Sequence, residues 1–137
     1  FRALIKATKR GVDVRLLLPK SSDVKIADIA AGSYFILAIK AGVKIYLYDK
    51  NRTLHTKTGI IDGTWGTIGS ANLDNLSLLL NFEGNIVSSD KKFISELKSR
   101  FIEDITRAEL LTKDGWMDRS FFRKFLEIIT WPIHELL

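Results

Sequence analysis

A strand–helix–strand pattern over residues 12–48 constrains the fold of this chain more than any other feature. Residues 12–18 (VDVRLLL) are mostly apolar and end at Pro19, which is typical of a strand buried on both faces. Apolar residues then recur at three-to-four spacing from Val24 to Ala38. This spacing predicts a helix that is capped at residues 21–23, ends at Gly42 and has one side on a sheet. Residues 43–48 form the next expected strand, and the order favours a right-handed parallel crossover in an α/β fold.

The middle of the chain predicts a hairpin, one further strand and a long helix. Residues 55–61 and 64–69 should pair around Asp62-Gly63, a dipeptide typical of two-residue hairpin turns. Residues 81–87 predict a strand, and Asp90 should cap a helix that continues to Arg107 with one apolar stripe. These elements predict a mixed, mostly parallel sheet sandwiched between helices, in one domain over residues 1–110.

The last part of the chain, residues 111–137, has a different pattern and is expected to be a separate amphipathic tail. Its aromatic and basic residues predict an amphipathic helix that ends or kinks at Trp131-Pro132. Two interpretations stay open: an interfacial membrane helix, or a helix docked on the domain or on a missing partner. His134 lies in this tail, and we assign it no catalytic role.

Composition limits the kinds of protein this chain can be. Its 137 residues suit one compact domain, and the absence of cysteine excludes disulfides and thiolate metal sites. The net charge of +5 favours anionic partners, either phospholipid headgroups or nucleic acid. The chain opens at Phe1 in what reads as the middle of a helix, so we expect it to be a fragment of a longer protein.

The stretch from His55 to Glu83 carries the side chains that could take part in catalysis. In a strand, His55 and Lys57 would project from the same face, where an ammonium and an imidazole suit an anionic phosphodiester. A nucleophilic imidazole needs an acceptor on its other nitrogen, which either Glu83 or Asp62 would supply. A small-residue turn follows, in which Ser70 and Asn72 would be neutral donors to the non-bridging oxygens and Gly69 would let the backbone approach the ligand.

Each of these residues alone has an ordinary structural explanation. A single histidine is more often a surface or core residue than a catalyst, and Lys57 alone would be a solvated side chain. Asp62-Gly63 is a turn signal by itself, and Asn72 would suit a helix cap. Only the combination at fixed spacing indicates a phosphoryl-transfer site.

The spacing His55-x-Lys57-x4-Asp62, followed after six residues by Gly69-Ser70-x-Asn72, resembles the HKD signature of the phospholipase D superfamily. The continuation through residues 72–83 and the upstream run over residues 41–49 are similar to bacterial cardiolipin synthases, and specifically to their C-terminal half. The resemblance implies a phospholipase D-like α/β/α half-domain with no metal and no other cofactor.

The resemblance also implies roles for individual residues. His55 would be a catalytic histidine, either nucleophile or general acid, and Glu83 would orient it. Lys57, Ser70 and Asn72 would bind the phosphate, while Asp62, part of the catalytic motif, would support the loop. The family uses two such motifs, and this chain holds one, so the second would come from a missing N-terminal half or from a second copy in a dimer.

The implied activity is phosphatidyl transfer, which forms cardiolipin from two phosphatidylglycerols through a phosphohistidine at a bacterial cytoplasmic membrane. The anchoring segments would lie outside this chain. A phosphodiesterase acting on lipid or nucleic acid is the alternative within the family. Leu76 stands where the family usually carries arginine, so a weakened binding half is also left open.

Overall fold

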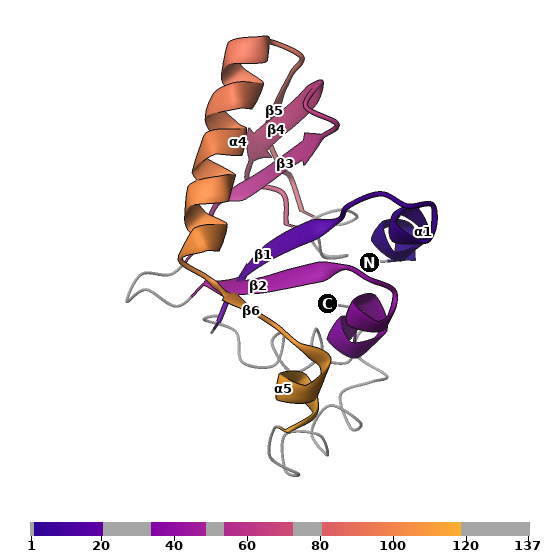
Figure 1. The fold of residues 1–137 in the computed structure, drawn as a ribbon. Helices are drawn as coiled ribbons and strands as arrows, with labels where there is room; N and C mark the ends of the chain where they lie inside the picture. Colours follow the sequence, from indigo (N-terminus) through magenta and orange to yellow (C-terminus); the bar gives the residue numbers. More distant parts are fainter. Residues whose placement is uncertain (1, 21–33, 49–53, 73–80, 119–137) are drawn as a thin grey trace.

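The computed structural model describes residues 2–20, 34–48, 54–72 and 81–118, and these residues form two three-stranded sheets (Figure 1). The first sheet has the order β1-β2-β6, with β1 at Arg15–Pro19, β2 at Lys44–Tyr48 and β6 at Glu109–Leu110. The second sheet has the order β3-β4-β5, with β3 at Lys57–Ile61, β4 at Trp65–Gly69 and β5 at Asn85–Ser88.

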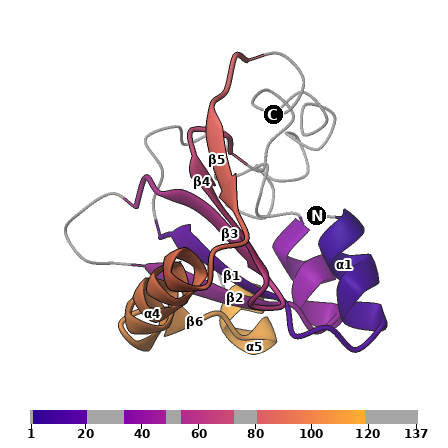
Figure 2. The same ribbon diagram turned by 90° about the horizontal axis from the view of Figure 1, so that it is seen from above.

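Helices lie on opposite sides of these sheets. Helix α1 (Arg2–Lys9) lies beside the helical residues 34–40, and α4 (Lys91–Thr106) lies on the other side of the molecule (Figures 1 and 2). The short helix α5 (Lys113–Met117) follows β6. The expected α/β class is therefore confirmed.

The predicted crossover through residues 12–48 forms the main core. β1 and β2 pair in parallel, with Leu16 opposite Ile45. Ala38 from the helical segment and Ile45 from β2 have no exposed surface, and Phe35 and Val43 are also buried in this cluster. The apolar spacing of the helical segment therefore corresponds to a face that packs on the sheet. The predicted N-cap at residues 21–23 lies outside the described residues.

The sheets are less parallel than the sequence suggested, which corrects the expectation of a mostly parallel sheet. Among the described strands, only β1 and β2 pair in parallel, whereas β2–β6, β3–β4 and β4–β5 are antiparallel. The two-residue turn at Asp62-Gly63 accounts for the β3–β4 pair, because such a turn can join only antiparallel strands. β6 follows α4 in the chain and pairs antiparallel with β2. No local sequence pattern in Glu109–Leu110 predicts this pairing.

The predicted hairpin turn is confirmed at Asp62-Gly63. Both residues have positive φ, 52° and 64°, and the amide of Thr64 donates to the carbonyl of Ile61 at 3.1 Å. Positive φ at both central positions matches the right-handed twist of the flanking strands, and aspartate and glycine tolerate it best. The hairpin fixes the register in which Lys57 lies opposite Gly69.

The predicted long helix is also confirmed and supports the second sheet. Asp90 is the N-cap of α4, and its carboxylate accepts from the amide of Phe93 at 2.8 Å. Ile94 is buried, and a Cβ built on Gly66 of β4 would lie 3.4 Å from the side chain of Ile94. Helix α4 also contacts β3, β1 and β2, so it bridges the two sheets.

Residues 111–118, expected in the tail, pack with the domain core. The amide of Leu111 donates to the carbonyl of Ile45 at 2.8 Å, and both side chains are buried. The Trp116 ring of α5 lies against Phe35, with centroids 5.2 Å apart. Leu111 and Trp116 therefore belong to the core cluster that includes Phe35 and Ile45. Residues 119–137, including the predicted amphipathic helix, lie outside the described residues, and no helix within the described part is long and apolar enough to span a bilayer.

Candidate active site

The histidine and the lysine of the motif lie at the start of β3. Lys57 is the first residue of the strand, whereas His55 precedes it in an irregular segment and is exposed. The ammonium of Lys57 donates to the main-chain oxygen of His55 at 2.9 Å. The alternation expected for a strand therefore holds from Lys57 onward, and it does not by itself fix the direction of the imidazole.

The strand register brings three segments to one edge of the second sheet. Lys57 of β3 lies opposite Gly69 of β4, and Gly69 lies opposite Asn85 of β5. Because paired residues share a face of the sheet, these three positions form a row at the edge. Ser70 follows Gly69 directly, and Glu83 lies two residues before Asn85. The edge thus collects the start of β3, the loop after β4 and the approach to β5.

Ser70 and Glu83 are joined directly at this edge. The hydroxyl of Ser70 donates to the Glu83 carboxylate. The Ser70 hydroxyl oxygen also accepts from the amide of Gly84 at 3.0 Å. The amide of Ser70 in turn donates to the carbonyl of Gly84 at 3.1 Å. Ser70 is therefore bound to residues 83–84 through both its main chain and its side chain.

The sequence suggested that Gly69 lets the backbone approach a ligand. In the structure, glycine is needed at position 69 for a different reason, namely the close approach of residues 84 and 85. A Cβ built there would lie 1.8 Å from Oδ1 of Asn85 and 2.3 Å from the carbonyl oxygen of Gly84. Those separations are far inside van der Waals contact, so no larger side chain fits without movement of β5. Gly69 thus allows β5 to approach the loop that carries Ser70.

Asn85 is a residue of this edge that sequence reasoning missed. Its Oδ1 accepts from the amide of Ala71 at 3.4 Å, which adds a weak contact to the loop. No spacing pattern marks Asn85, because its role depends on the pairing of β4 with β5 and on the glycine opposite it. Asn72, the last residue described in this segment, is exposed.

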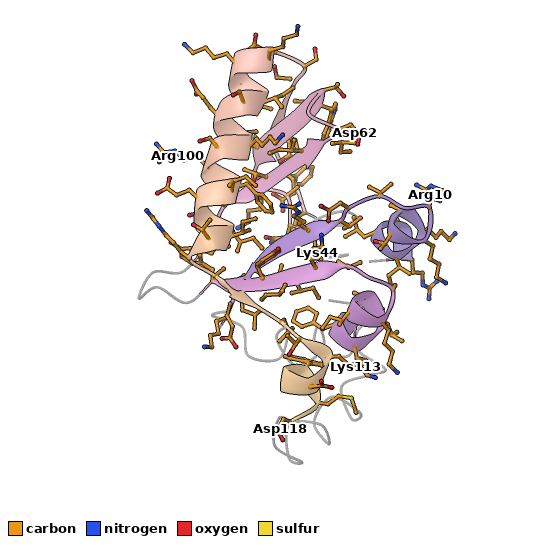
Figure 3. All side chains as sticks on the ribbon, in the orientation of Figure 1. Arg10, Lys44, Asp62, Arg100, Lys113 and Asp118 are labelled. Carbon is orange, nitrogen blue, oxygen red and sulfur yellow. The ribbon has the colours of Figure 1, made fainter. Side chains whose placement is uncertain are left out.

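The structure does not place Asp62 with the other motif residues. It lies at the tip of the hairpin, at the far end of β3 from Lys57 (Figure 3). Five residues of strand span roughly 16 Å, which is too far for a side-chain contact with Lys57. Asp62 is exposed and has the turn role described above. Leu76 and the family arginine position it occupies lie outside the described residues.

The edge therefore holds groups of the kinds that phosphoryl transfer uses. The exposed His55 and the half-buried Lys57 lie at the start of β3, and the Glu83 carboxylate bound to the Ser70 hydroxyl lies at the same edge of the sheet. The ammonium would attract an anionic phosphodiester, and the imidazole would attack phosphorus or transfer a proton. Within the described residues, no group of three or more His, Cys, Asp and Glu side chains is arranged to hold a metal ion.

Comparison with known proteins identifies the relationship that these residues suggest. Residues 1–105 match the family model described as the cardiolipin synthase, PLD-like domain. The chain belongs to this family. It is 37% identical to cardiolipin synthase A of Proteus mirabilis over 98% of its own length and 39% identical to the cardiolipin synthase of Geobacillus kaustophilus, also over 98%. The suspected relationship to phospholipase D-like proteins is confirmed.

The match covers only part of these relatives. The chain spans 28% of the length of the Proteus protein and 27% of the Geobacillus protein. Among solved structures, the fold resembles a phospholipase D family member, Nuc from Salmonella typhimurium, with a TM-score of 0.65 over 81% of this chain and 72% of that one. At 20% identity, this likeness supports the fold alone.

Proposed function

We propose that this chain supplies one half of the active site of a phosphatidyltransferase that forms cardiolipin from two phosphatidylglycerols. The observation that carries the proposal is the family match over residues 1–105, and it is supported by the sheet register that brings Lys57 to the edge where Ser70 contacts Glu83. Relatives that carry the name cardiolipin synthase match nearly the whole chain, which supports this substrate class over other phosphodiesters.

The reaction proceeds in two displacements at phosphorus. A histidine nitrogen attacks the phosphorus of the first phosphatidylglycerol, and the bond from phosphorus to the glycerol oxygen breaks. The leaving oxygen takes a proton from a second histidine, so glycerol departs and a phosphatidyl-histidine remains. The hydroxyl of a second phosphatidylglycerol then gives its proton to that second histidine and attacks phosphorus. Cardiolipin forms, and the first histidine is restored.

The motif residues of this chain have separate roles in that scheme. His55 is one of the two histidines, as nucleophile or as general acid. Lys57 and Asn72 hold the non-bridging oxygens of the phosphate, and Lys57 offsets the charge that builds up on them. Glu83 accepts from one ring nitrogen of the imidazole and fixes its orientation, so that the other ring nitrogen faces the reacting phosphate. Asp62 shapes the hairpin and lies away from the substrate.

The second histidine comes from outside this chain. The chain spans little more than a quarter of the matched relatives, so we place the other motif in another part of a longer protein. A second copy of this chain related by a two-fold axis is the alternative source. The substrates are lipids, so the longer protein works at a membrane surface.

Product analysis tests this function. The longer protein would be purified in detergent and incubated with phosphatidylglycerol labelled in its phosphate. The proposal predicts that cardiolipin forms and free glycerol is released. The amount of phosphatidic acid should not exceed the amount of cardiolipin. Phosphatidic acid as the main product would indicate a lipid hydrolase instead, and cleavage of a nucleic-acid substrate without turnover of lipid would indicate a nuclease. Binding of lipid without any product would indicate a weakened binding half.

A further inference from the structure

We propose that Ser70 is a positioning residue that holds Glu83, and that it does not act as a ligand of the phosphate. This inference rests on the proposed function, because it assigns a role within the same site. The Gly-Ser-x-Asn spacing alone suggested the opposite, namely a hydroxyl that donates to a phosphate oxygen.

The donor inventory of a serine hydroxyl decides between the two roles. A hydroxyl has one proton to donate and two lone pairs to accept with. The Ser70 proton goes to the Glu83 carboxylate, and one lone pair accepts from the amide of Gly84 at 3.0 Å. The carbonyl of Gly84 lies farther from the hydroxyl, at 3.5 Å, and is uncharged, so the carboxylate is the stronger acceptor. Donation to a phosphate would require Ser70 to leave Glu83.

The cost of that exchange falls on a half-buried carboxylate. Glu83 is only partly exposed, so a lost donor would not be fully replaced by water. The start of β3 brings the Lys57 ammonium to this edge, and His55 lies two residues earlier in the chain. A phosphate beside them would repel the Glu83 carboxylate, which is the acceptor of the Ser70 hydroxyl.

The main chain makes Ser70 a rigid support for this contact. Its amide donates to the carbonyl of Gly84, and the preceding Gly69 admits β5 at a separation that no Cβ would allow. The hydroxyl therefore approaches Glu83 from a fixed position. Ser70 acts on the reaction through the carboxylate, and the carboxylate acts through His55.

Carboxyl titration in the chain itself tests the contact without any need for activity. The Glu83 side-chain carbon would be followed by NMR through a pH series, with Glu83→Gln to assign its signal. In Ser70→Ala, the titration midpoint of this carboxyl should move to higher pH, because a carboxylate that loses a donor is protonated more easily. Ser70→Thr retains the hydroxyl and should restore the original midpoint. An unchanged midpoint in Ser70→Ala would overturn the proposal.

A matched variant separates this effect from general loosening of the sheet. Thr67 of β4 donates from Oγ1 to the carbonyl of Ile86 at 3.1 Å, and this contact does not involve the Glu83 carboxylate. Thr67→Val removes one hydroxyl contact between β4 and β5 and should leave the Glu83 midpoint in place. An equal shift in both variants would show that the effect is merely structural.

Turnover by the longer protein tests the role in the reaction. A hydrogen bond to a charged group is worth enough that Ser70→Ala should lower kcat about tenfold or more. KM should stay within about twofold, because the hydroxyl does not touch the substrate. A raised KM with unchanged kcat would make Ser70 a phosphate ligand. Should the longer protein form no cardiolipin, the proposed function fails, while the NMR titration still decides the role of Ser70.

Discussion

Lys57 donates a hydrogen bond from its ammonium to the main-chain oxygen of His55, 2.9 Å away. The lysine thus folds back along its own strand toward the residue that carries the imidazole. This contact uses one of the three ammonium donors, so two are left for a phosphate oxygen. The two residues of the motif are held together by a local contact, and they do not depend on the rest of the sheet for their proximity.

Replacing Lys57 should disable the site without unfolding the domain. We expect Lys57→Met to lower turnover by the longer protein about a hundredfold or more, because an electrostatic contact to developing charge is lost. Lys57→Arg should recover little of this activity, since a planar guanidinium does not reproduce a compact ammonium. Initial rates with phosphatidylglycerol provide the measurement. Lys91→Met on the exposed first turn of α4 is the matched control, and comparable rates for both methionine variants would contradict the assignment.

Gly69→Ala should destabilise the chain far more than Gly84→Ala. A Cβ at position 69 overlaps Asn85 and the carbonyl of Gly84, whereas a Cβ at position 84 has no atom within 4 Å. We expect a loss of about 2 kcal/mol or more for Gly69→Ala, as for other overpacked sites. Chemical denaturation of both variants measures the difference. Equal stabilities would show that β5 does not approach the loop as described.

The hairpin tip separates the turn role of Asp62 from a catalytic one. Gly63→Ala should cost about 1 kcal/mol because a positive φ of 64° is unfavourable for alanine. Asp62→Asn keeps a residue that tolerates positive φ and removes the charge, so turnover should stay within about twofold of wild type. A large loss of activity in Asp62→Asn, with normal thermal unfolding, would return Asp62 to the reacting groups.

Trp116 tests whether residues 111–118 belong to the domain. Its ring is 7% exposed and packs on Phe35, so Trp116→Ala should cost about 3 kcal/mol or more. The neighbouring Met117 is 51% exposed, and Met117→Ala should change stability by only about 0.5 kcal/mol. Urea unfolding of the two variants compares them directly. A small effect at Trp116 would favour the boundary expected at residue 110.

Much of this fold was predictable because its signals are local. The Asp62-Gly63 turn and the Asp90 cap each depend on a few neighbouring residues, and both were confirmed. The antiparallel pairing of β6 and the burial of Trp116 were not predictable, because they depend on contacts between residues far apart in the chain. Periodicity predicts which face of an element is buried, and it does not say which distant element covers it.

The candidate site likewise has features that the sequence predicts and features that only strand pairing determines. The sequence spacing predicted His55, Lys57 and Glu83 as candidate site residues. The structure adds the contacts that strand pairing makes around them. The bond from Ser70 to Glu83 and the close approach of Asn85 to Gly69 arise from the pairing of β4 with β5. Neither depends on residue spacing within a single strand, so the sequence could supply the groups but not their hydrogen-bond partners.

Acid should weaken the two surface ion pairs of Asp13, with Arg15 and with Lys44, in a defined pH range. Hydrogen bonds from Arg15 and then Lys44 lower the pKa of Asp13 to about 2 from an ordinary value of 3.8. The folded state therefore gains stability from Asp13 above pH 3.8, and that gain is lost as the pH falls through about 2. The side chain is 47% exposed, so the gain is about 1 kcal/mol or less.

The stability difference between wild type and Asp13→Asn measures this contribution. It should be present at neutral pH and shrink toward zero in strong acid, as followed by urea unfolding at a series of pH values. A difference that does not change with pH would mean that the ion pairs add nothing beyond the polar contact that asparagine retains.

The most direct test of the central claim is the rate of cardiolipin formation by the longer protein when only His55 is replaced by alanine. The account predicts a loss of at least about a thousandfold, with an unchanged thermal unfolding profile, because one of the two histidines that move the phosphatidyl group is gone. Wild-type rates of cardiolipin formation in the His55→Ala protein would contradict it.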